Sequence, residues 1–387
     1  MAVIFDKPSI EEISGARFTE GNGVKLLYKG RDSFNAIFES VDKAEKLVCL
    51  QFYIFRNDET GTELAELLRK KAGQGVKVYI LYDHFGSFGT PGRFWNDLKE
   101  CGIAIRASRP FKWLSPFHYA HRDHRKLLII DSSKAFTGGL NIANEYRGFH
   151  IRWRGGWRDT GILLEGPIVY QLFHTFQRAW QTWGGDTISF PETRTCCQPS
   201  PVPGDELPVI PIFASSARGR RKMRKLLYYS ITNARESIFL TTAYFTPSRR
   251  MLDCLEEAVR RGVEVKLLLP GVSDVPAAYY TARAFFTRLL KAGVRIFEYQ
   301  GEVLHAKSYV FDGCWSVVGS ANLDFQSLRW NDEGNVGILD ERFGQEMISV
   351  FNEDLNHSVE IREEKWLKRE LWEKIKERFF VLFRRRL

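Results

Sequence analysis

The chain has 387 residues and a formal net charge of +9. This length allows two ordinary domains or one large body of two similar halves, and the charge predicts an anionic partner, either a membrane surface or a nucleic acid. The sequence has no uncharged apolar run of about 18 residues that could cross a membrane as a helix, and its first residues do not resemble a secretory signal. The six cysteines show no metal-ligand spacing and predict reduced thiols, so we expect no metal and no cofactor.

Secondary-structure signals occur twice in the same order. After an N-terminal extension, 1–22, a first half is predicted over 23–189 and a second over 212–360. The corresponding segments are the buried strands 44–55 and 234–245, the helices 64–71 and 251–261, the strands 76–83 and 263–269, and two helices that end at Gly102 and Gly293. Alternating strands and helices predict an α/β fold of two pseudo-symmetric halves packed together, with mixed, mostly parallel sheets flanked by helices.

Three segments lie outside this repeat. A Pro-rich stretch, 190–211, predicts a linker between the halves. An aromatic and basic segment, 109–119, has no counterpart in the second half and predicts either a packed surface insertion or a lip beside the functional site that contacts lipid. The C-terminal residues 361–387 predict a basic amphipathic helix, with one apolar face formed by Leu367, Leu371, Ile375, Phe379 and Leu382. Such a helix either lies on an anionic membrane surface or docks on the body of the protein.

The most informative repeat is a short motif, His-x-Lys followed by four residues and Asp, with an Asn in a small-residue turn further on. In both copies the Asp follows the His by seven residues and the Asn follows it by 17. A single copy is a weak signal, but two matched copies predict one site assembled from two half-sites. The residues concerned are His124, Lys126, Asp131 and Asn141 in the first copy and His305, Lys307, Asp312 and Asn322 in the second.

These residue types suit the chemistry of a phosphodiester. Residues two apart on a strand share a face, so each His should point the same way as its Lys. Two ammonium groups and two amides can donate hydrogen bonds to phosphate oxygens, and we expect Asn141 and Asn322 to bind the substrate phosphate. One His would attack phosphorus, and the other would protonate the leaving alkoxide and then deprotonate the incoming nucleophile.

A nucleophilic His needs a partner that fixes its tautomer, and a carboxylate follows each motif. We assign each of these carboxylates, Asp159 and Glu333, to the histidine of its own half. The aspartates Asp131 and Asp312 belong to the catalytic motif, but they close its strands. We expect them to brace the turn rather than to contact substrate.

With these residues identified, the chain resembles the phospholipase D superfamily, whose signature is two His-x-Lys-x4-Asp motifs, each followed by a Gly-containing turn with Asn. The resemblance covers roughly 23–360 and is strongest to short bacterial-type cardiolipin synthases, on the segments 138–143, 157–160, 164–167, 243–247, 319–324 and 331–335. It implies a phosphatidyl-histidine intermediate, with His124 as the nucleophile and His305 as the general acid and base. It also implies transfer of a phosphatidyl group from one phosphatidylglycerol to another, with release of glycerol.

The resemblance implies lipid partners, but it leaves membrane attachment unexplained, because longer family members carry transmembrane anchors that are not expected here. The location follows instead from the positive charge, the reduced cysteines and the basic C-terminal segment. We expect a peripheral protein at the cytoplasmic face of the cell membrane, with phosphatidylglycerol and cardiolipin as lipid partners. It should act as a monomer, because one chain carries both half-sites. Alternatives on the same fold are a phospholipase D-type hydrolase and a nucleic-acid phosphodiesterase, whereas the complete residue set in both halves disfavours a non-catalytic lipid-binding scaffold. Two motifs in one aromatic, apolar chain favour lipid, so nucleic acid is not expected as a partner.

Overall fold

The computed structural model describes residues 5–111, 121–149, 156–191 and 206–384. The first half contains α1 (Lys7–Ser14), β1 (Thr19–Leu27), α2 (Gly30–Asp42), β2 (Leu47–Phe52), α3 (Glu59–Gly73), β3 (Lys77–Asp83), α4 (Gly92–Glu100), β4 (Ala104–Ser108), β5 (Leu127–Ile130), β6 (Lys134–Gly138), α5 (Asn144–Arg147), β7 (Gly161–Glu165) and α6 (Ile168–Thr182). Most of the expected lip, 109–119, and of the expected linker lies outside the described residues.

The second half repeats this series. It contains β8 (Leu207–Ala214), α7 (Ala217–Asn233), β9 (Ser237–Thr241), α8 (Arg249–Arg260), β10 (Glu264–Pro270), α9 (Pro276–Arg283), α10 (Phe286–Lys291), β11 (Arg295–Tyr299), β12 (Ser308–Phe311), β13 (Trp315–Gly319), α11 (Phe325–Arg329), β14 (Glu333–Leu339) and α12 (Glu341–Asn356). The C-terminal part adds β15 (Ser358–Ile361), α13 (Glu363–Leu367) and α14 (Leu371–Val381).

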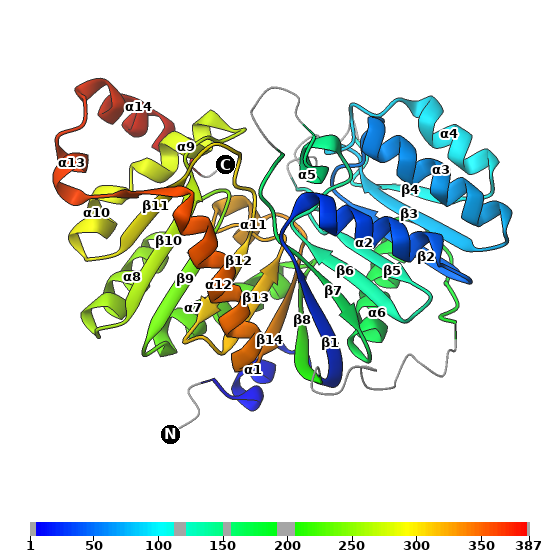
Figure 1. Ribbon diagram of the computed structural model, residues 1–387, viewed down its shortest axis with the longest axis horizontal. Coiled ribbons are helices and arrows are strands. Elements are labelled where there is room, and N and C mark those ends of the chain that lie inside the picture. The colour runs from blue at the N-terminus through cyan, green and yellow to red at the C-terminus, as the bar shows by residue number, and fades with distance from the viewer. Residues whose placement is uncertain (1–4, 112–120, 150–155, 192–205, 385–387) are drawn as a thin grey trace.

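One sheet of 15 strands runs through the described part of the molecule. The second half contributes the order β11-β10-β9-β12-β13-β14-β8, and the first half contributes the equivalent order β4-β3-β2-β5-β6-β7-β1. The two series meet at the antiparallel pair of β8 and β1, and Figure 1 shows the strands of the halves spreading to either side of it. The prediction of two pseudo-symmetric α/β halves is confirmed.

The predicted predominance of parallel strands is wrong. Parallel pairs occur within β2-β3-β4 and within β9-β10-β11, and the other paired strands of the described sheet are antiparallel. After each motif the chain reverses in a tight turn, with positive φ at Asp131 and Ser132 in one half and at Asp312 and Gly313 in the other. These turns join β5 to β6 and β12 to β13 as antiparallel hairpins, whereas the alternation of strands and helices predicted mostly parallel pairing.

Equivalent residues begin and end the equivalent helices. The side chain of Asp58 accepts from the third residue of α3, and that of Ser248 does the same for α8, so both helices start at a capped N-terminus. Past their C-terminal ends, Gly75 and Gly262 adopt φ values of 90° and 89°, which favour glycine. Each helix therefore returns the chain to the edge where the next parallel strand begins.

A shared apolar core joins the halves. One cluster of buried side chains includes members of α6, of α12 and of strands from both halves: Ile129, Leu164, Leu172, Phe176, Val310, Val336, Met347 and Phe351. Burial of a large apolar side chain contributes about 1.5–3 kcal/mol. The halves should therefore fold as one body, which fixes their relative position at the site between them.

The structure has strands that begin inside two segments expected to lie outside the halves. β1 begins at Thr19, inside the expected N-terminal extension, and α1 packs on α7 of the second half, where Phe5 and Ile10 are buried. β8 begins at Leu207, so 207–211 of the expected linker form a strand paired with β1 and β14. The N-terminal extension and the end of the linker therefore both help to join the halves.

The expected single C-terminal helix over 361–387 is also wrong, because the described part of this segment forms the two helices α13 and α14. The chain turns between the two helices at Arg369, whose guanidinium donates to the backbone oxygen of Trp366 and to the carboxylate of Glu377. Within the described residues, no helix is both long and apolar enough to span a bilayer.

Candidate active site

Backbone hydrogen bonds between the two halves place each motif histidine against residues of the other half. The His124 N–H donates to the backbone oxygen of Asp332 (2.9 Å), and the His305 N–H donates to that of Arg158 (2.7 Å). Both contacts belong to short parallel bridges between the halves. Asp332 and Arg158 directly precede the two expected orienting carboxylates. Each histidine therefore lies beside the carboxylate of the opposite half.

The side chains confirm this exchange. Nδ1 of His124 lies 3.1 Å from Oε2 of Glu333, and Nδ1 of His305 lies 2.7 Å from Oδ2 of Asp159. All four side chains are buried. The two carboxylates that the sequence singled out do contact the histidines, but the predicted pairing within each half is wrong. The spacing of the motifs along the chain does not indicate which carboxylate contacts which histidine, because that depends on how the two halves pack.

Each motif lysine lies next to its own histidine, as residues two apart on one strand face should. Nζ of Lys126 donates to the backbone oxygen of His124 at 2.7 Å, and Nζ of Lys307 donates to that of His305. Nζ of Lys307 is also 2.7 Å from Nδ1 of His305. Both ammonium groups are almost fully buried, so the low polarity around them strengthens their electrostatic interaction with nearby charges.

A cavity of about 440 Å³ lies between the halves and contains both histidines in its wall. This volume is within the range of small-molecule sites. The two lysines are behind this wall rather than in it. The lining residues from the two halves are Tyr53, Ile54, Arg56, Arg122, His124, Asn141, Tyr146, Trp157, Tyr244, Asp274, Val275, Ala278, His305, Asn322, Asp324, Gln326, Ser327 and Asn331.

The two motif asparagines line the cavity but differ in their contacts. The amide of Asn141 accepts from the N–H of Ile54 (3.1 Å) and donates to the hydroxyl of Tyr146 (2.8 Å). The Asn322 oxygen accepts from the hydroxyl of Thr242 at 3.4 Å. Both amides are therefore oriented by the protein, and the expected role of Asn141 and Asn322 in binding phosphate stays a prediction.

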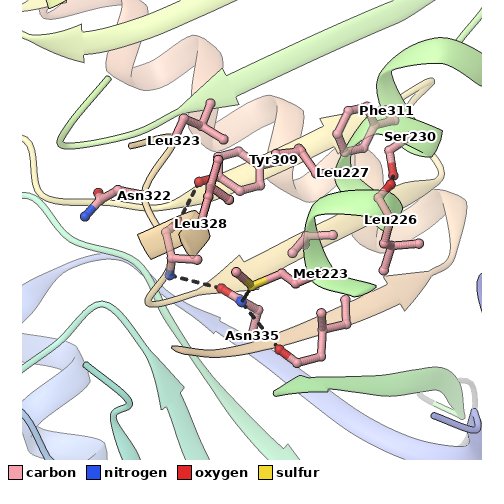
Figure 2. Close-up of a pocket in the computed structure, with 13 residues that line it drawn as sticks. Met223, Leu226, Leu227, Ser230, Tyr309, Phe311, Asn322, Leu323, Leu328 and Asn335 are labelled. Atoms are coloured by element: carbon pink, nitrogen blue, oxygen red, sulfur yellow. Dashed lines mark hydrogen bonds between the residues drawn. The ribbon is translucent and has the colours of Figure 1, made fainter. Parts of the chain in front are cut away.

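A second, smaller gap of about 30 Å³ lies beside the Asn322 turn, in the apolar core of the second half (Figure 2). Asn335 lies at its edge, where its side-chain oxygen accepts from the N–H of Ala321 at 3.1 Å. Figure 2 shows the amide of Asn322 pointing away from this gap. The gap is packing space, and it bears on the active site through Asn335, which holds the turn that carries Asn322.

Aromatic side chains that the sequence analysis did not assign surround the histidines. The Tyr53 ring meets His124 edge-on, with ring centroids 5.0 Å apart. His305 is surrounded by Tyr146 at 5.4 Å, Trp157 at 5.1 Å and Tyr244 at 6.2 Å. A usable signal was that Tyr53 and Tyr244 lie near the ends of the two equivalent predicted strands, 44–55 and 234–245. These rings cover part of each imidazole and help to bury it.

Burial shifts the pKa values of the site, and it does so unequally in the two pairs. Burial raises the pKa of Glu333 to about 7 although Lys126 opposes the shift. Burial would also raise the pKa of Asp159, but Lys307 and His305 outweigh it and hold that pKa below its ordinary value. The carboxylate beside His305 is therefore ionised at neutral pH, while the carboxyl beside His124 takes up a proton readily.

The pKa values of the lysines and histidines are lowered, which favours the neutral forms of these side chains. Burial lowers the pKa of Lys126 to about 7 and that of Lys307 to about 8. Burial and the two lysines lower the pKa of His124 well below its ordinary value. The pKa of His305 is also lowered by burial and by Lys307, but Asp159 opposes that shift. An anionic phosphate in the cavity would restore the positive charge of these groups.

The motif aspartates lie away from the cavity and support the backbone. The carboxylate of Asp131 accepts from three consecutive N–H groups, those of 45–47, at 2.7–2.9 Å. The carboxylate of Asp312 accepts in the same way from 235–237 at 2.8–3.1 Å. Asp131 and Asp312 thus brace the turns as expected. They belong to the catalytic sequence motif, but they do not line the active-site cavity.

We expect Asp131→Ala to reduce stability rather than chemistry. Loss of a charged acceptor for three N–H groups should lower the free energy of unfolding by about 2–3 kcal/mol, measured by urea denaturation, because hydrogen bonds to charged groups are the stronger ones. Turnover of the folded protein should stay near that of wild type. Asp97→Ala, on the exposed face of α4, is the matched control. A large loss of turnover at unchanged stability would instead place Asp131 in the chemistry.

Among the described residues, no group of three or more His, Cys, Asp and Glu side chains is arranged to hold a metal ion. The described cysteines, Cys49, Cys101, Cys254 and Cys314, are free thiols.

Comparison with known sequences gives a consistent match. Residues 37–180 and 227–355 match the family described as "Cardiolipin synthase, PLD-like domain". Cardiolipin synthase 2 of Bacillus anthracis is 33% identical over 360 residues, which span 92% of this chain and 69% of that protein. The major cardiolipin synthase ClsA of Bacillus subtilis (strain 168) is 34% identical over 365 residues, which span 94% of this chain and 75% of that protein.

Similar solved structures support the fold. Phosphatidylserine synthase of Haemophilus influenzae Rd KW20 superposes with a TM-score of 0.73 over 97% of both chains, at 13% sequence identity. Polyphosphate kinase from Porphyromonas gingivalis has a TM-score of 0.59 over 89% of this chain and 49% of that chain, at 15% identity. At these identities the likeness extends to the architecture of the two halves alone.

Proposed function

Because the chain belongs to the cardiolipin synthase family of phospholipase D-like enzymes, we propose that it transfers the phosphatidyl group of one phosphatidylglycerol to a second, forming cardiolipin and releasing glycerol. The observation that supports this most directly is the pair of buried histidines in one cavity, each in contact with a carboxylate through Nδ1. Nε2 of each imidazole is then the nitrogen that reacts, in the manner of a triad.

In the first step His124 attacks. Its Nε2 forms a bond to phosphorus, and the bond from phosphorus to the oxygen of the glycerol headgroup breaks. His305 gives its proton to that oxygen, so glycerol leaves as a neutral alcohol and a phosphatidyl-histidine remains. Proton transfer of this kind contributes about 10²–10⁴-fold to the rate.

In the second step the phosphatidyl group moves to the acceptor. The neutral His305 takes the proton from a hydroxyl of a second phosphatidylglycerol, whose oxygen attacks phosphorus while the bond to His124 breaks. The product is cardiolipin, and both histidines return to their starting protonation states. Arg56 and Arg122, in the cavity wall, could attract the phosphate of the second lipid.

The unequal electrostatics of the two pairs support this division of roles. A nucleophile must be neutral, and His124 has the more strongly lowered pKa of the two histidines. A general acid must hold a proton, and His305 contacts the ionised Asp159. The phosphate charge is met by Lys126 and Lys307, whose positive charge it would restore.

Lipid product analysis tests the proposal. Purified protein mixed with vesicles of phosphatidylglycerol should yield cardiolipin and glycerol in equal amounts, and a double variant, His124→Ala/His305→Ala, should yield neither. Phosphatidic acid as the main product would mean that the enzyme is a hydrolase. Comparable cleavage of single-stranded DNA would favour the nucleic-acid phosphodiesterase instead.

We further propose that the enzyme acts as a monomer on the surface of the cytoplasmic membrane. Both half-sites belong to one chain, and one cavity contains both histidines, so a second copy is not needed to complete the site. The substrates of the proposed reaction are anionic bilayer lipids, which attract a chain of net charge +9.

A further inference from the structure

The C-terminal helix α14 is docked on α9 through one of its faces. The ring of Phe380 stacks on Tyr280 of α9, with centroids 5.5 Å apart. Glu377, 2% exposed, accepts from Arg369 at 2.7 and 3.0 Å and lies 3.9 Å from Nε of Arg283. Figure 1 shows α14 beside α9 at the outer end of the second half. Aromatic stacking and a buried ion pair thus fix which way the helix faces.

The opposite face of α14 is apolar and exposed. Successive residues of a helix are turned by about 100°, which brings six large apolar side chains of α14 and the residues just after it onto this face. They are between 44% and 75% exposed, and we call them the apolar stripe: Leu371, Trp372, Ile375, Phe379, Leu382 and Phe383. Contiguous exposed apolar surface of this kind marks an interaction site rather than ordinary protein surface.

Basic side chains border the stripe on both sides. By the same helical spacing, Lys374 and Arg378 follow one edge and Lys376 follows the other. The first edge opens into a cavity of about 300 Å³, lined by Ala284, Thr287, Leu367, Arg369, Lys374, Glu377 and Arg378. The carboxylate in this lining, Glu377, is already paired with Arg369. The edge therefore offers positive charge to an anion, next to an apolar surface.

The helix α9 connects this surface to the active site. Val275 and Ala278, at the start of α9, line the active-site cavity. Tyr280 and Arg283, further along the same helix, contact α14. Helix α9 therefore connects the helix that carries the stripe to the cavity in which a phospholipid headgroup would react.

We propose that the apolar stripe is a docking surface for an anionic phospholipid bilayer. The stripe would lie at the boundary of headgroups and acyl chains, while Lys374 and Arg378 contact lipid phosphates. This inference rests on the proposed function for the nature of the substrate, but it concerns a different surface. Charge selects lipid over a second copy of the chain, because two stripes with basic borders would repel each other face to face.

Vesicle binding by the full chain tests this inference. A triple variant, Leu371→Ser/Ile375→Ser/Phe379→Ser, should bind vesicles of equimolar phosphatidylglycerol and phosphatidylcholine at least about tenfold more weakly. Each serine lacks the favourable free energy of burying an apolar side chain in the membrane interface. Lys374→Gln/Arg378→Gln should lower binding about fivefold per charge, and only with phosphatidylglycerol present. Sedimentation of vesicles measures both. The stripe is exposed, so the triple variant should keep the wild-type melting temperature.

Matched controls remove similar groups elsewhere. Tyr170→Ser/Val359→Ser removes exposed apolar side chains of α6 and β15, and Lys99→Gln/Arg260→Gln removes the same charge from α4 and α8. Both control variants should bind vesicles like wild type. Undiminished binding by the triple variant would overturn the proposal. So would a wild-type dimer that the triple variant converts to a monomer in size-exclusion chromatography, because the stripe would then cover a second copy.

A soluble substrate separates this inference from the proposed function. Dihexanoyl phosphatidylglycerol below its micelle concentration presents no surface, so the triple variant should turn it over like wild type. If wild type forms no dihexanoyl cardiolipin from it, the proposed function fails while the vesicle result stands. If wild type turns it over and the triple variant does not, the stripe acts on the chemistry and the docking role is contradicted.

Discussion

The His305→Ala variant should accumulate a phosphatidyl adduct on His124 when the leaving group needs no protonation. With phosphatidyl-p-nitrophenol, nitrophenolate leaves without an acid, so attack by His124 proceeds, but the acceptor hydroxyl then finds no base. Turnover should fall by about 10²–10⁴-fold while a stoichiometric burst of nitrophenolate persists. Rapid absorbance measurements detect the burst, and mass spectrometry at neutral pH detects the adduct, because acid hydrolyses phosphorus–nitrogen bonds.

The His124→Ala variant should show neither burst nor adduct, and its turnover should fall by at least about 10³-fold because it has lost the nucleophile. A suitable control is His174→Ala, on α6, where the ring contacts Tyr170 away from the cavity. That variant should give the wild-type burst. A burst from His124→Ala but not from His305→Ala would exchange the two roles. No adduct in either variant would argue against a covalent intermediate.

The sequence was sufficient to predict the fold class and the histidines and carboxylates that the structure brings together. The repeat predicted two similar halves because each half must bury the same pattern of strands and helices. The second copy of the motif predicted that His124 and His305 share one cavity, and they do. The expected bracing role of Asp131 and Asp312 also agrees with the structure, although the N–H groups that their carboxylates bind belong to distant segments, 45–47 and 235–237.

The features that could not be predicted depend on long-range packing. The exchange of carboxylates follows from bridges that join Arg158 to Leu304 and Asp123 to Asp332, segments far apart in the chain and without a local signal. The antiparallel hairpins after the motifs depend on turns that contain non-glycine residues at positive φ, which propensity does not reveal. The break between α13 and α14 likewise had no sequence signal, because no Gly or Pro marks it. The turn is held instead by the side-chain contacts of Arg369.

The exchanged carboxylates lead to opposite kinetic effects for two conservative variants. An amide in place of Glu333 cannot hold His124 in the tautomer that attacks, so Glu333→Gln should lose the burst with phosphatidyl-p-nitrophenol. Asp159→Asn should keep the burst and slow the transfer to the acceptor, because it disables His305. With phosphatidylglycerol, which needs both histidines in both steps, either variant should lose about 10³–10⁴-fold in turnover.

Ser320→Ala provides a graded control for this prediction. The hydroxyl of Ser320 donates to Oε2 of Glu333 at 2.5 Å, so its loss should slow the burst about tenfold and leave the later transfer unchanged. The first half has Gly139 at the corresponding position, where a Cβ would lie 2.0 Å from the Asp159 carboxylate, so no equivalent hydroxyl supports the His305 pair. If the carboxylates acted within their own halves, Asp159→Asn would lose the burst, and neither Glu333→Gln nor Ser320→Ala would affect it.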